Sequence, residues 1–222
     1  MSTFAEKKWG DCSKAVAYNL NFVQMCYMSG SRSWSDFYNV DCSYCESPSS
    51  QKTDFEYPKG KFVKKDYYIL DELYFGVSEN LRNDMIKYGA GNSDFRPIYS
   101  AKRACILGYQ VVPENVLPPI YQVNKMTPVV TCKKCGRTLY EYGDDTGYHE
   151  AYDGFGYPYY LTQEACKSLK PLNRMFETKE EVIISLDMYN NLIRKYPKLE
   201  CRPVFLGSVY TDREYIRLHN YE

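Results

Sequence analysis

Two pairs of cysteines, each separated by two residues, are the side chains best placed to do chemistry in this sequence. Cys42 and Cys45 lie in the segment DCSYCE, and Cys132 and Cys135 lie in VTCKKCGR. Four thiolates form the tetrahedral ligand set of a closed structural zinc site, and a two-residue gap lets one tight turn direct two sulfurs to the same point. The sequence therefore predicts a Zn²⁺ site made of Cys42, Cys45, Cys132 and Cys135.

The residues around the second pair favour metal binding. Gly136 follows the pair directly and can adopt the positive φ that closes such a turn. Backbone N–H groups of such turns can donate to the sulfurs, and Lys133, Lys134 and Arg137 would offset the negative charge of four thiolates. Between Cys45 and Cys132 lie 86 residues, more than in a compact zinc ribbon. The metal is therefore expected to join distant segments of one fold.

The predicted zinc has a structural role. A catalytic zinc keeps an open position and usually recruits histidine or carboxylate, whereas four cysteines complete the coordination. The chain has only two histidines, His149 and His219. The alternative is two unrelated thiol pairs, free or redox-active. A thioredoxin-type pair, however, opens a helix, whereas Cys135 is followed by the strand-like TLYEY.

Charge and composition narrow the class of protein. The 28 basic and 28 acidic residues cancel, which argues against the strongly basic surface of most nucleic-acid-binding proteins. No window approaches the roughly 18 consecutive apolar residues of a membrane helix, and the first thirty residues lack the pattern of a secretion signal. Nine cysteines without such a signal indicate reduced thiols. We therefore expect a soluble, cytosolic protein.

Tyrosine is unusually frequent, at 24 of 222 residues. Tyrosine covers a large area with few rotatable bonds, which suits partner-binding surfaces, although it also packs well on half-buried strands. The densest aromatic segment follows two acidic residues that would suit a basic partner, and its alternative role is a loop folded onto the core. The candidate binding residues are Asp144, Asp145, Tyr148, Tyr152, Phe155, Tyr157 and Tyr159.

Two segments share a strand–serine–helix–strand pattern. In the first, residues 73–77 precede Ser78, a helix that ends at Gly89, and the strand DFRPIY. In the second, residues 182–184 precede Ser185, a helix that Pro197 ends, and the strand ECRPVF. Each serine is a predicted N-cap, and each helix has one apolar face. The pattern predicts an internal repeat, with chance similarity of two short segments as the alternative; a weaker third version at 159–169 lacks the Arg-Pro strand.

These elements predict an α+β fold of mostly antiparallel sheets. About three short helices and about nine strands are expected, too few helices for a doubly wound sheet. We expect one zinc-stapled domain over residues 1–222, with two lobes. Residues 1–145 would form the lobe with both cysteine pairs, and residues 146–222 the lobe with the second strand–helix–strand unit.

The two cysteine pairs, the second written CKKCG, resemble the bacterial double-CxxCG proteins of about this length. The segments VSENLRNDMIKY–DFRPIY and ISLDMYNNLIRKY–ECRPVF are similar to a unit common in bacterial immunity-type proteins. The resemblance covers about 70 residues, and the first pair departs from the family pattern because Glu46 stands where a glycine is expected. The resemblance implies a non-enzymatic protein that binds and neutralises a toxin.

Three functions are therefore weighed. The leading hypothesis is a protein-binding zinc protein that acts as an immunity protein against a bacterial toxin. The second is a nucleic-acid-associated zinc protein, because Lys133, Lys134 and Arg137 make the second cysteine turn basic. The third is an enzyme whose site is assembled from scattered residues that form no recognisable motif.

Overall fold

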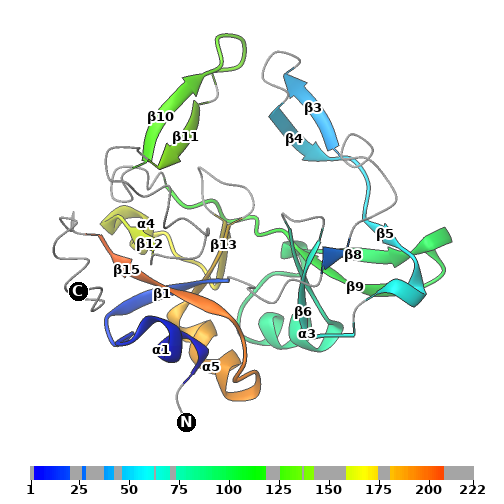
Figure 1. Cartoon of the computed structure of the whole chain (residues 1–222), viewed down its shortest axis with the longest axis horizontal. Coiled ribbons are helices and arrows are strands. Elements are labelled where there is room, and N and C mark those ends of the chain that lie inside the picture. The colour runs from blue at the N-terminus through cyan, green and yellow to red at the C-terminus, as the bar shows by residue number, and fades with distance from the viewer. Residues whose placement is uncertain are drawn as a thin grey trace.

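The protein is an α+β fold built from two sheets and two separate hairpins (Figure 1). The computed structural model describes residues 3–20, 27–28, 38–42, 47–62, 64–70, 74–118, 126–136, 138–142, 159–174 and 181–207. Eight of the eleven strand pairings within these ranges are antiparallel, which confirms the predicted class. The described strands number fifteen, more than the nine expected, because strands of two or three residues are too short to show an alternating pattern.

The first sheet has five strands, and we call it with its helices the β1 lobe after its central strand. The central strand runs antiparallel to both neighbours, β14 and β15. The order across the sheet is β12 (Tyr159–Leu161), β15 (Cys201–Leu206), β1 (Ala15–Leu20), β14 (Val182–Ser185) and β13 (Leu172–Arg174).

The second sheet has six strands, and we call it with its helix the β9 lobe. Its central strand β9 runs antiparallel to both β7 and β8. The order across the sheet is β2 (Tyr27–Met28), β6 (Tyr67–Leu70), β7 (Tyr74–Val77), β9 (Ile106–Val111), β8 (Phe95–Ser100) and β5 (Glu56–Tyr57).

Five strands of each sheet have the same order and the same directions. A helix joins the two neighbours of each central strand: α3 (Glu79–Lys87) joins β7 to β8, and α5 (Leu186–Lys195) joins β14 to β15. Outside them, β5 is parallel to β8 as β12 is to β15, and β6 is antiparallel to β7 as β13 is to β14. Both predicted strand–helix–strand units therefore form within one larger repeated arrangement, and its origin by duplication stays a prediction.

The register of the strands is also the same in both lobes. In the β9 lobe Arg96 lies opposite Gln110, and in the β1 lobe Arg202 lies opposite Asn19. The following prolines, at positions 97 and 203, lie opposite the tyrosines at positions 109 and 18. The segment AYNL of β1 therefore matches GYQV of β9, although β9 follows β8 directly and β1 comes from the N-terminal stretch.

Each of the two long helices begins at the predicted serine. The Ser78 Oγ accepts from the Leu81 N–H, and the Ser185 Oγ accepts from the Met188 N–H, both at 3.2 Å. The serine N–H groups also donate to equivalent carbonyls, of Asp66 at 2.8 Å and of the proline at position 171 at 3.0 Å. Helix α4 (Gln163–Lys167) belongs to the weaker third pattern.

Helix α1 (Phe4–Trp9) was not expected from the sequence. Thr3 accepts from the Glu6 N–H, and the Glu6 carboxylate accepts from the Thr3 N–H. This reciprocal capping box was visible in the sequence as TFAE but is short enough to be overlooked.

The faces of the two sheets that carry α3 and α5 pack into one hydrophobic core. Hydrogen bonds also join the lobes, because the Tyr196 hydroxyl and the Lys195 Nζ both donate to the Asp84 Oδ2 at 2.6 Å. The opposite face of each sheet has a smaller core of its own. Buried residues of the shared core include Tyr18, Val77, Leu81, Met85, Phe95, Ile184, Met188, Tyr189 and Leu192.

Two hairpins lie on the same side of the molecule, at the top of Figure 1. One consists of β3 (Tyr38–Cys42) and β4 (Ser47–Gln51), and the other of β10 (Met126–Thr131) and β11 (Thr138–Tyr142). The first hairpin precedes β5 in the chain, and the second precedes β12, so one hairpin comes before each run of consecutive strands, β5–β9 and β12–β15. The predicted boundary at residue 145 stays untested, although β1 pairs with strands of the C-terminal half.

Candidate metal centre

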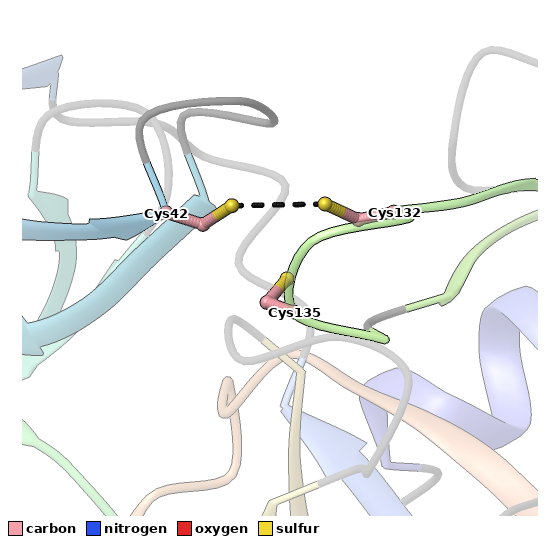
Figure 2. Close-up of side chains that lie close together, drawn as sticks. All are labelled: Cys42, Cys132 and Cys135. Atoms are coloured by element: carbon pink, nitrogen blue, oxygen red, sulfur yellow. Dashed lines mark hydrogen bonds between the residues drawn. The ribbon is translucent and has the colours of Figure 1, made fainter.

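Three of the four predicted metal ligands lie together where the end of β3 approaches the turn between β10 and β11 (Figure 2). Cys42 is the last residue of β3, Cys132 directly follows β10, and Cys135 lies in the turn before β11. The three Sγ atoms lie within 4.8 Å of one another. The hairpins thus bring together thiols that are 90 residues apart in the chain.

The distance between the two buried thiols fits a shared metal ion. The Sγ atoms of Cys42 and Cys132 are 3.6 Å apart. Two sulfurs bound to one tetrahedral Zn²⁺ at about 2.3 Å would be separated by roughly 3.8 Å. The sulfurs therefore lie at the spacing that a single tetrahedral ion requires.

The turn after β10 has the geometry expected of a metal-binding turn. The Gly136 N–H donates to the Cys132 carbonyl at 2.8 Å, and Gly136 has a φ of 72°. The expected role of this glycine is confirmed, because residues with a side chain rarely adopt a positive φ. The turn places Cys132 in a buried position and Cys135 in an exposed one.

Backbone N–H groups of this turn stabilise a thiolate at Cys132. The N–H of Cys135 donates to the sulfur and lowers the pKa of the Cys132 thiol; burial opposes this shift, and the N–H of Lys134 adds to it. The Cys135 thiol lowers the pKa further, and the thiol of Cys42 raises it. These are the sulfur-directed hydrogen bonds that support thiolate ligands in metal sites.

The fourth predicted ligand, Cys45, lies outside the described residues, in the connection between β3 and β4. The structure therefore supports a cluster of Cys42, Cys132 and Cys135 that can hold a metal ion. It is the one such cluster of histidine, cysteine and carboxylate side chains in the described part of the chain. Thiolates are soft ligands, so Zn²⁺ suits them better than Mg²⁺ or Ca²⁺.

The predicted aromatic binding surface falls almost wholly outside the described residues. Tyr159 is the first residue of β12 and pairs with Val204 of β15. The other candidates, for which the structure gives no test, are Asp144, Asp145, Tyr148, Tyr152, Phe155 and Tyr157.

The relation between the cysteine pairs and the repeated units was missed in the sequence. Each pair precedes one strand–serine–helix–strand unit, so the chain reads pair, unit, pair, unit. The spacing hides this order, because 36 positions separate Cys42 from Ser78 and 53 separate Cys132 from Ser185. One pair before each unit accounts for the large separation of the two pairs in the chain, which a single enlarged zinc ribbon would not.

No protein-family description, curated protein or solved structure matches this chain. Among the residues that the structure describes, no helix is long and apolar enough to cross a membrane.

Proposed function

We propose that this is a non-enzymatic, protein-binding zinc protein in which one structural Zn²⁺ joins the two hairpins. The observation that carries the proposal is the convergence of Cys42, Cys132 and Cys135 from separate hairpins. With Cys45 as the fourth ligand, each hairpin would supply one CxxC pair. Such a closed set leaves no position on the metal for a substrate.

The metal would hold the two hairpins in one relative orientation. A hairpin of two strands is only marginally stable without further packing, so a crosslink between two hairpins strongly limits their motion. A surface held in its binding conformation loses less entropy when a partner binds. The metal would therefore serve binding by pre-organising the hairpins and the turns that they carry.

The partner that we propose is a protein toxin. The support is the resemblance of the two CxxC pairs and the Arg-Pro units to bacterial immunity-type proteins. The aromatic and acidic segment from Asp144 to Tyr159 would contribute to a surface for a basic partner.

Metal content tests the first part of this proposal. Purified protein should contain one zinc ion per chain by elemental analysis, and Cys42→Ser or Cys132→Ser should each lose most of it. The matched control is Cys166→Ser, since this half-buried thiol lies outside the cluster. Wild-type protein without zinc, or zinc unaffected by both ligand changes, would contradict a shared site.

Partner capture tests the second part. The product of an adjacent gene should co-purify with the wild-type chain, and co-expression should protect cells from its toxicity. The Cys42→Ser variant should bind that partner more weakly. A neighbouring product that is neither toxic nor bound would remove the immunity assignment and leave the metal site intact.

A nucleic-acid-binding role is the second candidate, favoured by one observation. Lys133 and Lys134 are exposed in the turn between Cys132 and Cys135. Because phosphate contacts weaken steeply with rising salt, gel shifts at low and moderate ionic strength provide the test. No shift even at low salt would exclude this role.

A further inference from the structure

Arg96 attaches the base of the β3–β4 hairpin, which carries Cys42, to the β9 lobe. Its Nη1 donates to the carbonyl oxygen of Gln51, the last residue of β4, at 3.2 Å. Its Nη2 and Nε both donate to the Asp54 Oδ1, at 3.1 and 3.3 Å. One guanidinium in β8 thus holds two points of the segment that leads from the hairpin into the sheet.

This segment continues along β8 beyond the arginine. The Tyr99 N–H donates to the Phe55 carbonyl at 2.9 Å, and β5 then pairs in parallel with the end of β8. Arg96 is therefore the contact nearest the hairpin in a series that runs down the strand. Arg96 therefore lies where the contacts with the β9 lobe end and the β3–β4 hairpin begins.

A small rotation of the β3–β4 hairpin about its base moves Cys42, at the other end of the hairpin, by a larger distance. Gln51 pairs with Tyr38 at the base of the hairpin, and Cys42 pairs with Ser47 at the opposite end. Four residue steps span about 13 Å, so a tilt of about 10° at the base would move the tip by about 2 Å. Metal coordination tolerates only a few tenths of an ångström.

We propose that Arg96 is a positioning residue for the metal centre: by fixing the base of the β3–β4 hairpin it sets the place of the Cys42 thiol and hence metal affinity. The inference rests on the proposed zinc site. It assigns a role to the Arg-Pro pair of β8, which no metal-ligand motif contains.

Arginine suits this role better than lysine. The planar guanidinium offers several N–H donors in a fixed geometry, so it can hold a carboxylate and a carbonyl at once. Arg202 occupies the equivalent register position in the β1 lobe, where it is buried.

Arg103 provides a matched control. Its Nη2 donates to the other oxygen of Asp54, Oδ2, at 2.7 Å, but it lies at the turn between β8 and β9. Arg96→Lys and Arg103→Lys each keep the positive charge and alter the hydrogen bonds to one oxygen of the same carboxylate. Only Arg96→Lys also removes the guanidinium that donates to the Gln51 carbonyl.

The experiment compares zinc affinity in wild type, Arg96→Lys and Arg103→Lys by competition with a chromophoric chelator. Arg96→Lys should bind Zn²⁺ about 10-fold more weakly or worse, the usual effect of changing a residue that orients a metal ligand. Arg103→Lys should stay within about 2-fold of wild type. Co²⁺-substituted protein should keep its thiolate charge-transfer bands in all three, because the ligands are unchanged.

A second readout separates positioning from general stability. If Arg96 positions the hairpin, Arg96→Lys should reduce the Tm gain that zinc produces over zinc-free protein, since that gain follows metal affinity. A merely structural role would lower both Tm values equally. If Arg96→Lys does not fold, both measurements are made on Asp54→Asn, which weakens the hydrogen bonds between Asp54 and Arg96.

The outcomes distinguish this inference from the proposed function. Wild-type protein that binds no zinc overturns the metal site itself. Wild-type protein that binds zinc, together with Arg96→Lys of unchanged affinity, overturns the positioning role alone. Equal losses in Arg96→Lys and Arg103→Lys also overturn it, because the charge around Asp54 would then matter and not the contact to the hairpin.

Discussion

The two lobes share strand order, direction and register, but they fill the outer face of the sheet differently. In the β9 lobe the ring of Tyr68 lies over Gly76 and Gly108, where any added Cβ would overlap it. The Tyr68 hydroxyl donates to the Val77 carbonyl at 3.0 Å. One large side chain therefore occupies the space above two glycines.

In the β1 lobe the equivalent positions hold Asn173, Ile183 and Ala17. Asn173 is fully buried, and its amide donates to the carbonyls of Lys170 and Ile183 at 2.7 and 3.0 Å. The same three backbone positions thus hold one large aromatic residue and two glycines in the β9 lobe. In the β1 lobe they hold an asparagine, an isoleucine and an alanine. Strand register is shared while side-chain volume is redistributed, since close packing constrains total volume more than identity.

The largest effect on stability should come from truncating Ile183, the large aliphatic side chain on the outer face of the β1 lobe. Ile183→Ala would leave a cavity in a fully buried position and should destabilise the protein by about 3 kcal/mol, measured by urea unfolding. The control Ile106→Ala, at 48% exposure, should change stability by less than about 0.5 kcal/mol. Similar small losses in both variants would show that the outer core of the β1 lobe is loosely packed.

A smaller effect should come from replacing Gly108 of the β9 lobe with alanine, the residue that the β1 lobe has at the equivalent position, Ala17. Gly108→Ala should cost about 2 kcal/mol because the new methyl group meets the Tyr68 hydroxyl. The cost should fall in a Tyr68→Phe background, which lacks that hydroxyl. A double-mutant cycle measures the coupling, and additive losses would contradict the packing difference between the lobes.

The contact between the lobes should depend on pH. Burial raises the pKa of the Asp84 carboxyl, but hydrogen bonds from Lys195 and Tyr196 outweigh it and hold the pKa below its usual 3.8. Because the folded-state pKa is the lower one, this stabilisation is complete above about pH 5 and is lost as pH falls through the folded pKa. Asp84→Asn should lose about 1–2 kcal/mol at pH 7.

Acid unfolding measures this contribution. The stability difference between wild type and Asp84→Asn should narrow as pH falls below about 4. A difference that stays constant down to pH 2 would mean that the carboxylate charge does not stabilise the junction of the lobes.

The smallest effects should be equal in the two lobes. Ser78→Ala and Ser185→Ala each remove one N-cap hydrogen bond of 3.2 Å and should each cost about 1 kcal/mol. Ser78→Ala also removes the hydrogen bond that the Ser78 hydroxyl donates to Asp66 Oδ1 at 2.9 Å, which adds little because that contact is exposed to water. Thermal or urea unfolding of both variants tests whether the shared backbone arrangement carries equal local energies. If the cost at one serine exceeds the cost at the other by more than about 1 kcal/mol, the two lobes differ at their helix N-termini as well as on their outer faces.

The sequence predicted the local elements well and the long-range arrangement poorly. The two serine-capped helices, the Arg-Pro strands and the glycine-closed turn at Gly136 are confirmed, and so is the α+β class. The short strands, helix α1 and the place of β1 in the C-terminal sheet were missed. Of the predicted metal ligands, Cys42, Cys132 and Cys135 come together, and Cys45 lies outside the described residues.

The sequence by itself determined those features whose causes lie within a few residues. A serine caps the helix that follows it, and a CxxC pair with a glycine forms its own turn, because hydrogen bonds and backbone preferences act locally. The tertiary structure alone decided that β1 completes the first sheet, that Tyr68 covers two glycines, and that Cys42 at the end of β3 lies beside the turn after β10. These depend on contacts between residues far apart in the chain, which packing selects and no local pattern records.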